Sequence, residues 1–348
     1  MEPGQRFLIP AKSADSVIDA DNAASPETLV LRQQIAEACQ SWLLRSPSPK
    51  TRSNYDRDLR QFLAFVGVPA DRPEALAAIR PHQVAAWRDH LQEAGLTNSS
   101  IRRKMTAVRS LYSYLQTYGF VGANPAHSDF VAAPAVPRDG KTVALSPGDC
   151  RRLLDAPKAS RRDENTEKVI PLPAGVRDRA LLAVLAYTGC RVGELTRLKV
   201  GSYKLNGVHR VLEIMGKGGK ERLVPVHLEA AERLEIWLDT AGIRGELSRP
   251  LFPPTIPAWG RDRQGFASRP MTSRAVQKLV ESYVGQLGLD PNVTVHSLRV
   301  TALTTAREQG SDIIDLQDFA GHADPRTTLT YIRSRDRLSK SPAYVLKY

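Results

Sequence analysis

The sequence predicts a mainly α-helical protein with one small β-sheet, divided between a helical N-terminal domain and a mixed α+β C-terminal domain. Three observations carry this prediction. Apolar residues recur at helical spacing through the first third of the chain, an extended stretch rich in proline and small residues follows, and a glycine-rich turn joins two apolar runs in the second half. A length of 348 residues is sufficient for two domains, each with its own core.

The N-terminal helices can be placed one by one. Residues 1–25 are polar and lack a helical pattern, so we expect a flexible tail there. A first helix is expected from Pro26 to the Ser-Pro-Ser-Pro stretch, and a second over about 51–66. A third opens at Pro81, a residue suited to the first helical position, and a fourth follows Thr97, which can cap it. These helices predict a compact four- or five-helix domain.

Domain boundaries follow from the change in composition. The helical domain is expected over 26–128, a linker over 129–145 and the second domain over 146–348. In the second domain we expect an amphipathic helix over about 175–187 and a β-hairpin around 216–219. Two Pro- and Arg-rich stretches are expected to form surface loops: 157–174 and 249–270.

The chain is strongly basic, with a formal net charge of +12 and a pI of about 9.7. Such a surplus favours a polyanionic partner, of which nucleic acid is the commonest, although a merely basic enzyme remains an alternative. Cations gather at two neighbouring helix starts, where a solvated helical face is the alternative to a phosphate-tracking surface. The candidate DNA-binding residues are Lys50, Arg52, Arg57, Arg102, Arg103, Lys104, Arg109, Lys220 and Arg222.

Several classes of site are not indicated. The three cysteines, Cys39, Cys150 and Cys190, are far apart, which favours reduced thiols over a disulfide framework or a zinc site. No apolar run is long enough to span a bilayer, and the N-terminus does not resemble a signal peptide. We therefore expect a cytoplasmic protein without a membrane partner.

Five side chains suited to binding a phosphate occur in the C-terminal domain. Arg191 follows a glycine and precedes Glu194 by three residues, and His296 and Arg299 are one helical turn apart. The others are Lys217, in the glycine-rich turn, and His322. Arginine binds phosphate with two parallel hydrogen bonds, and histidine can donate a hydrogen bond or exchange a proton near neutral pH.

A tyrosine close to these cations is a candidate nucleophile. Tyr331 comes nine residues after His322, about two turns into a helix expected to begin at Asp324-Pro325. Each feature alone has a simpler interpretation: a surface ion pair for Arg191 and Glu194, a solvated turn for Lys217, and a core aromatic for Tyr331. Their combination instead indicates breakage and rejoining of a nucleic-acid backbone through a phosphotyrosine.

The order and spacing of these motifs resemble the tyrosine recombinase family, also called phage-type integrases, in its two-domain, Xer-like form. TGCRVGEL is similar to that family's first arginine motif, GKGGKER to its lysine hairpin and HSLR to its second arginine motif. The third match is a Gly-His pair with Tyr331 nine residues further on. The resemblance covers about 146–335, and the preceding helices are similar to the family's SAM-like core-binding domain.

The resemblance implies a role for each residue. Tyr331 would attack the scissile phosphate and remain joined to the 3′-phosphate, while Arg191, Arg299 and His322 bind the non-bridging oxygens. His296 would serve as general base or further donor, and Lys217 as general acid. Glu194 would support Arg191. No metal or other cofactor is implied.

The resemblance also implies partners. These are double-stranded DNA with paired inverted half-sites, and a homotetramer on synapsed DNA that exchanges strands through a Holliday junction, for integration, excision or resolution of a mobile element or plasmid. Free in solution, the chain would be a monomer or weak dimer, acting on the bacterial nucleoid. We expect the C-terminal residues Tyr344, Val345 and Leu346 to dock on a neighbouring subunit, with packing on the same subunit as the alternative.

Three other functions remain open at this point. A type IB topoisomerase would use similar chemistry to relax DNA without exchanging strands between specific sites. A DNA-binding regulator could keep the fold without the reaction, although the complete set of candidate catalytic residues argues against it. A purely electrostatic RNA-binding protein would leave the ordered motifs unexplained.

Overall fold

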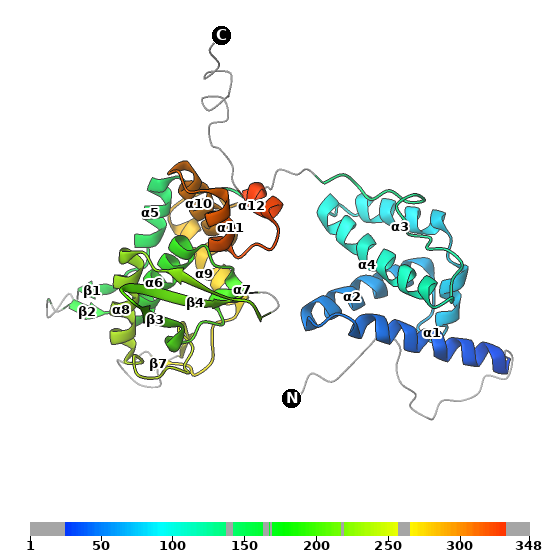
Figure 1. Ribbon diagram of the computed structural model, residues 1–348, viewed down its shortest axis with the longest axis horizontal. Coiled ribbons are helices and arrows are strands. Elements are labelled where there is room, and N and C mark those ends of the chain that lie inside the picture. Colours follow the sequence, from blue (N-terminus) through cyan, green and yellow to red (C-terminus); the bar gives the residue numbers. More distant parts are fainter. Residues whose placement is uncertain are drawn as a thin grey trace, which may run out of the picture. The chain divides into compact units, whose positions relative to one another are not determined.

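The computed structural model describes residues 25–136, 142–162, 167, 169–216, 219–256 and 265–331, with only the backbone at 171, 330 and 331. The chain forms two compact units, Met1–Pro137 and Arg138–Tyr348, each with its own hydrophobic core (Figure 1). The division falls within the segment expected to link two domains. The predicted mainly helical fold with small antiparallel sheets is confirmed. Lys217, the N-terminal tail and the C-terminal docking segment lie outside the described residues.

The helices of the first unit begin where the sequence predicts. They are α1 (Pro26–Leu44), α2 (Pro49–Val66), α3 (Pro81–Glu93) and α4 (Asn98–Thr117), with a 3₁₀ helix η1 (Pro73–Ala78) that the sequence analysis did not predict. The Ser-Pro-Ser-Pro stretch lies between α1 and α2, and the Ser48 hydroxyl caps α2 by accepting a hydrogen bond from the Thr51 amide. Thr97 caps α4 in the same way.

The α4 helix is the centre of the first unit, since it contacts α1, α2 and α3. Its apolar face is fully buried, and Trp42 and Trp87 pack in the same core. Burial of these side chains stabilises the unit by roughly 2–3 kcal/mol each. Two charged groups among the described residues, Asp58 and Lys104, are buried beside this core. The Asp58 carboxylate on α2 is fully buried and accepts hydrogen bonds from Arg103 and, at 3.2 Å, from the Lys104 ammonium.

The second unit surrounds one buried helix, α6 (Pro173–Thr188). The helix was predicted, but its amphipathic character was not correct. α6 is buried around most of its circumference because it packs against α5 (Pro147–Asp155), α8 (Leu228–Ala241) and α10 (Val295–Glu308). The helix ends at Gly189, whose φ of 57° is left-handed, as expected for a glycine cap.

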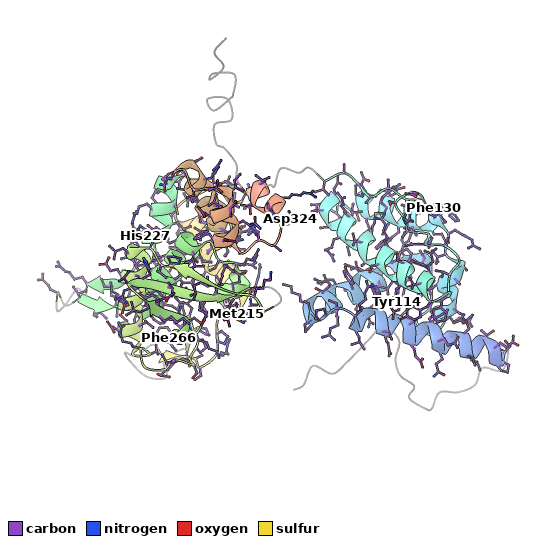
Figure 2. All side chains as sticks on the ribbon, in the orientation of Figure 1. Tyr114, Phe130, Met215, His227, Phe266 and Asp324 are labelled. Atoms are coloured by element: carbon purple, nitrogen blue, oxygen red, sulfur yellow. The ribbon has the colours of Figure 1, made fainter. Side chains whose placement is uncertain are left out.

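A three-stranded antiparallel sheet lies beside these helices, in the order β3 (Tyr203–Asn206), β4 (His209–Met215) and β5 (Glu221–Pro225). A 3₁₀ turn, η2 (Val200–Ser202), leads into it. The β4–β5 pair confirms the predicted hairpin, with Met215 opposite Glu221 at its last pair (Met215 is labelled in Figure 2). The sequence analysis did not predict β3.

Both stretches expected to be surface loops contain short strands instead. These strands are β1 (Ser160–Arg162), β2 (Val169–Pro171), β6 (Thr255–Ile256) and β7 (Gly265–Phe266), and each pair is antiparallel. Two or three residues per strand are too few to show the alternation that predicts a strand.

Helices make up most of the last described part of the second unit, from Ser273 to Tyr331. They are α9 (Ser273–Gln286), α10, α11 (Ile313–Ala320) and α12 (Pro325–Tyr331). Much earlier in the chain, shortly after Gly189 and Cys190, the four-residue helix α7 (Val192–Leu195) follows α6. The α12 helix contacts α10 and α11, as Figure 1 shows. Among the described residues, no helix is long and apolar enough to cross a membrane.

The buried carboxylate of the first unit provides a test of its packing. In Asp58→Asn the Lys104 ammonium, only 6% exposed, loses its counter-charge, so the free energy of unfolding of this unit should fall by about 2–4 kcal/mol. Native-state hydrogen exchange of the α4 amides measures this loss. Asp89→Asn, which removes the surface ion pair with Arg88, is the matched control and should leave the exchange unchanged. Equal protection of α4 in all three proteins would show that the Asp58 charge is not needed.

Candidate active site

Arg191 is placed at a sharp corner between two helices. The chain leaves α6 at Gly189, and Arg191 is the residue before α7, so that its side chain turns back over the first turn of that helix. Its Nη1 donates to Glu194 Oε1 at 2.7 Å, and its backbone amide donates to Glu194 Oε2 at 2.9 Å. One carboxylate therefore fixes both the backbone and the side chain of Arg191.

Glu194 differs from a surface ion-pair partner because it is buried and serves two arginines. Its side chain is 3% exposed, and Oε2 also accepts from Arg222 Nη2 at 2.7 Å. Burial alone would raise the pKa of Glu194, but hydrogen bonds from Arg222 and Arg191 outweigh burial and lower the pKa to about 2. Glu194 is therefore an anion at neutral pH, and the simple surface-pair interpretation does not apply.

Arg299 is the most deeply buried charge of the second unit, with 1% of its surface exposed. It projects from the second turn of α10. Its guanidinium donates to the Gly189 carbonyl, to the Ala320 carbonyl at 2.7 Å and to His322 Nε2 at 2.7 Å. Arg299 thus joins the end of α6, the end of α11 and the turn that follows α11.

His322 is buried between Arg299 and α12. A guanidinium can only donate, so Nε2 of His322 accepts from Arg299, and Nδ1 carries the proton that is donated to Thr328 Oγ1 at 2.9 Å. Burial, followed by the charges of Arg299, Arg191 and Arg222, lowers the pKa of His322 to about 4. The imidazole is therefore neutral at neutral pH, with a defined tautomer.

His296 lines a pocket with both of the catalytic arginine candidates. This pocket has a volume of ≈ 450 Å³ and is lined by Arg191, His296 and Arg299, with Gln277 and Glu281 of α9 among the other lining residues. Desolvation in the pocket, followed by the charges of Arg299 and Arg191, lowers the pKa of His296. The pocket therefore combines two guanidiniums with a neutral imidazole, a set of donors that fits a phosphate.

Tyr331 and Lys217 are placed only by their position in the chain. Tyr331 is the last residue of α12. Asp324, labelled in Figure 2, lies just before this helix and accepts a hydrogen bond from the Arg326 amide. Because α12 contacts α10, the tyrosine belongs to a helix packed on the one that carries His296 and Arg299. Lys217 falls in the turn between β4 and β5, outside the described residues.

The candidate DNA-binding residues divide into two groups. Most are exposed or half-exposed: Lys50, Arg52, Arg57, Arg102, Arg103 and Lys220. Arg103, although exposed, also donates to Asp58. The other three are likewise engaged within the protein. Lys104 is paired with Asp58, Arg109 donates to the carbonyls of Ala126 and Val131, and Arg222 is paired with Glu194. The expectation of a solvated face does not describe these three side chains.

Two groups of residues at the site carry no signal in the sequence. Gln277 and Glu281 were overlooked because α9 carries no motif, and Thr328 because its link to His322 depends on the turn between α11 and α12. Arg222 had a usable signal: it lies two residues before Val224, which is buried, so alternation along β5 directs it to the inner face of the sheet. Within the described residues, no group of three or more His, Cys, Asp or Glu side chains could hold a metal ion.

Comparisons with known proteins identify the family of the chain. Residues 145–337 match the model of the phage integrase family, and 42–119 match the phage integrase N-terminal SAM-like domain. The tyrosine recombinase XerC of Pelobacter propionicus is 35% identical over 298 residues, which cover 84% of this chain and 88% of the relative. XerC of a Methylobacterium species is 30% identical over 320 residues, covering 88% and 92% respectively.

A solved structure supports the fold. The crystal structure of a lambda integrase tetramer bound to a Holliday junction matches with a TM-score of 0.63 and 18% identity, covering 89% of this chain and 78% of that one. The family match spans more than half of the chain and contains every candidate catalytic residue, from Arg191 to Tyr331. The chain therefore belongs to the phage integrase family, the family of the tyrosine recombinases.

Proposed function

We propose that this tyrosine recombinase cleaves and rejoins DNA strands at specific sites through a covalent bond between Tyr331 and a 3′-phosphate. The observation that carries the proposal is the pocket that Arg191, His296 and Arg299 line together. Two of these residues belong to α10, which contacts α12, the helix that ends in Tyr331. A phosphodiester fits this pocket because its two non-bridging oxygens match two guanidiniums. The arginines would stabilise the negative charge that develops at phosphorus during the attack.

The chemical step needs two proton transfers, one from the attacking Tyr331 hydroxyl and one to the departing 5′-oxygen. Tyr331 Oη forms a bond to phosphorus while the bond from phosphorus to the 5′-oxygen breaks. The phenol proton passes to His296, and Lys217 gives a proton to the departing 5′-oxygen, so that no charge is left on either oxygen. The lowered pKa of His296 supports its role, because a neutral imidazole has a lone pair that can accept the proton.

Reversal of this step joins strands without a nucleotide cofactor. The phosphotyrosine retains the energy of the phosphodiester, so a 5′-hydroxyl from another strand can displace Tyr331 and restore the DNA backbone. In this scheme His322 first holds Arg299 in place through Nε2. His322 can contact the phosphate only after Arg299 has given up its hydrogen bond to Nε2 and bound the DNA instead. Glu194 keeps Arg191 aligned throughout.

The proposed partner is duplex DNA with paired inverted half-sites, which a homotetramer would synapse and exchange through a Holliday junction. The net charge of +12 and the exposed cations of α2 and α4 support binding to phosphates. The homology to XerC proteins of bacteria supports action on the bacterial nucleoid, in the cytoplasm. The free chain would be a monomer or weak dimer, and its biological event integration, excision or resolution of a mobile element or plasmid.

Covalent trapping tests the proposed reaction. The wild-type chain, Tyr331→Phe and Tyr118→Phe are incubated with nicked fragments of bacterial DNA, denatured and analysed for protein linked to DNA. Wild type and Tyr118→Phe, which alters an exposed tyrosine of the first unit, should form the adduct, and Tyr331→Phe should form none, because it lacks the attacking oxygen. Sequencing the trapped DNA would identify the target. An adduct with Tyr331→Phe, or a link at another residue, would contradict the assignment.

The lowered pKa of His322 predicts a loss of stability in mild acid. The unfolded imidazole titrates near 6.5 and the folded one near 4, so the unfolded state binds more protons between these values and stability falls as the pH drops from 6.5 to 4. Each pH unit between the two pKa values contributes about 1.36 kcal/mol, so the stability lost between pH 6.5 and 4.5 is roughly 2–3 kcal/mol. Urea unfolding of the full chain between pH 7 and 4.5 measures this loss.

A variant separates His322 from the other acid-sensitive groups. His322→Gln cannot be protonated, so its stability, although lower at pH 7, should depend less on pH over the same window. Histidine titration by NMR should place the native His322 pKa well below 6. An ordinary value near 6.5, or the same pH dependence in His322→Gln, would show that the imidazole is not held neutral by burial and the neighbouring arginines.

A further inference from the structure

Arg222 occupies an unusual place for a basic residue next to a DNA-binding turn. Its side chain is only 13% exposed, and its Nη2 donates to the buried Glu194 carboxylate at 2.7 Å. The residue before it, Glu221, and the residue after it, Leu223, are exposed, so the strand turns Arg222 inward while its neighbours face solvent. A guanidinium in this position is poorly placed for an ordinary phosphate contact.

The other side of Arg222 packs on the turn that precedes His322. A β-carbon built on Gly321 would lie 2.9 Å from Arg222 Nη1 and 3.1 Å from Cζ, closer than side chains approach. Gly321 also has a φ of 61°, which glycine adopts readily. The guanidinium therefore lies against the backbone of the Gly321–His322 turn, in a space that any larger residue at 321 would fill.

These contacts place Arg222 between the two halves of the proposed site. On one side, Arg222 and Arg191 share the two oxygens of Glu194. On the other side, the turn that it contacts leads to His322 and then to α12 and Tyr331. Arg222 itself belongs to β5, the strand that follows the turn with Lys217. The pocket that holds Arg191, His296 and Arg299 does not include Arg222 among its lining residues.

We infer that Arg222 is a positioning residue for strand cleavage: it aligns Arg191 through Glu194 and holds the β4–β5 hairpin against the Gly321–His322 turn. This inference rests on the proposed function, because it concerns the same reaction. It replaces the expectation that Arg222 binds DNA phosphates directly. Loss of Arg222 should slow cleavage while leaving the affinity for DNA nearly unchanged.

Salt dependence distinguishes positioning from direct contact. Each phosphate contact contributes about 0.9 to the slope of the logarithm of affinity against the logarithm of salt concentration. Arg222→Gln should keep the wild-type slope, whereas Lys220→Gln, which alters an exposed lysine of the same hairpin, should lower it by about 0.9. Binding is measured on a duplex carrying the sequence recovered from wild-type adducts. A fall in slope with Arg222→Gln would overturn the inference.

Adduct formation at saturating DNA measures the effect on cleavage. Arg222→Gln should reduce its rate by about 10- to 100-fold, the cost typical of a misplaced catalytic group. Arg244→Gln is the matched control: it breaks an Arg–Glu pair with Glu235, outside the pocket, and should react at the wild-type rate. A rate for Arg222→Gln equal to that of the control would contradict the positioning role.

The titration of Glu194 provides a readout that a general loss of packing would not give. The charged and titratable groups around Glu194 are Arg191 and Arg222, which donate to it, and Cys190 and His322, which interact with it at longer range. Without Arg222 one donor is lost, so the pKa of Glu194 should rise, which carboxyl titration by NMR measures. Arg222→Lys keeps a charge and should return the Glu194 pKa toward the wild-type value. An unchanged Glu194 pKa in Arg222→Gln would overturn the inference.

The wild-type chain separates the inference from the function on which it depends. A wild-type adduct at Tyr331, together with a wild-type rate in Arg222→Gln, would remove only the role of Arg222. Absence of an adduct with the wild type would overturn both. Circular dichroism at the assay temperature confirms that each variant is folded.

Discussion

The buried guanidinium of Arg299 is the interaction on which the arrangement of the site depends. A charge that is 1% exposed is tolerated only when it is hydrogen-bonded, and here acceptors of the Nη groups are the carbonyls of Gly189 and Ala320 and the imidazole of His322. Both carbonyls lie at the C-terminal ends of helices, where the helix dipole is negative and favours a cation. One side chain thereby fixes two helix ends and the turn that leads to α12.

Burial and the arginine charges together determine the protonation of the neighbouring groups. Burial, followed by the charges of Arg299 and Arg191, keeps His296 and His322 neutral. Glu194 stays ionised because hydrogen bonds from Arg222 and Arg191 outweigh its burial. The result is a site that offers a phosphate permanent cations while its imidazoles stay free of charge, which suits a reaction that must move protons at neutral pH.

The sequence predicted the α-helices of the first unit, and it singled out Arg191, His296 and Arg299, which line one pocket, but it did not predict helix α8 or all of the surroundings of the pocket. Helices with a polar cap and one apolar face, such as α4, could be placed because both signals are local. The engagement of Lys104 could not be predicted, because its partner Asp58 is 46 residues away and meets it only when α2 packs on α4. Helix α6 was misjudged for the same reason, since its burial depends on three other helices.

Two glycines show why the order of motifs predicted more than any single residue. Gly189 and Gly321 end α6 and α11 in left-handed conformations, and each is followed within two residues by a side chain of the site, Arg191 or His322. A β-carbon on Gly189 would lie 3.2 Å from the ring of Phe319, and one on Gly321 would collide with Arg222. Because the helix ends converge this closely, each glycine-led motif requires the other, and neither Gly-Cys-Arg nor Gly-His alone would position a phosphate.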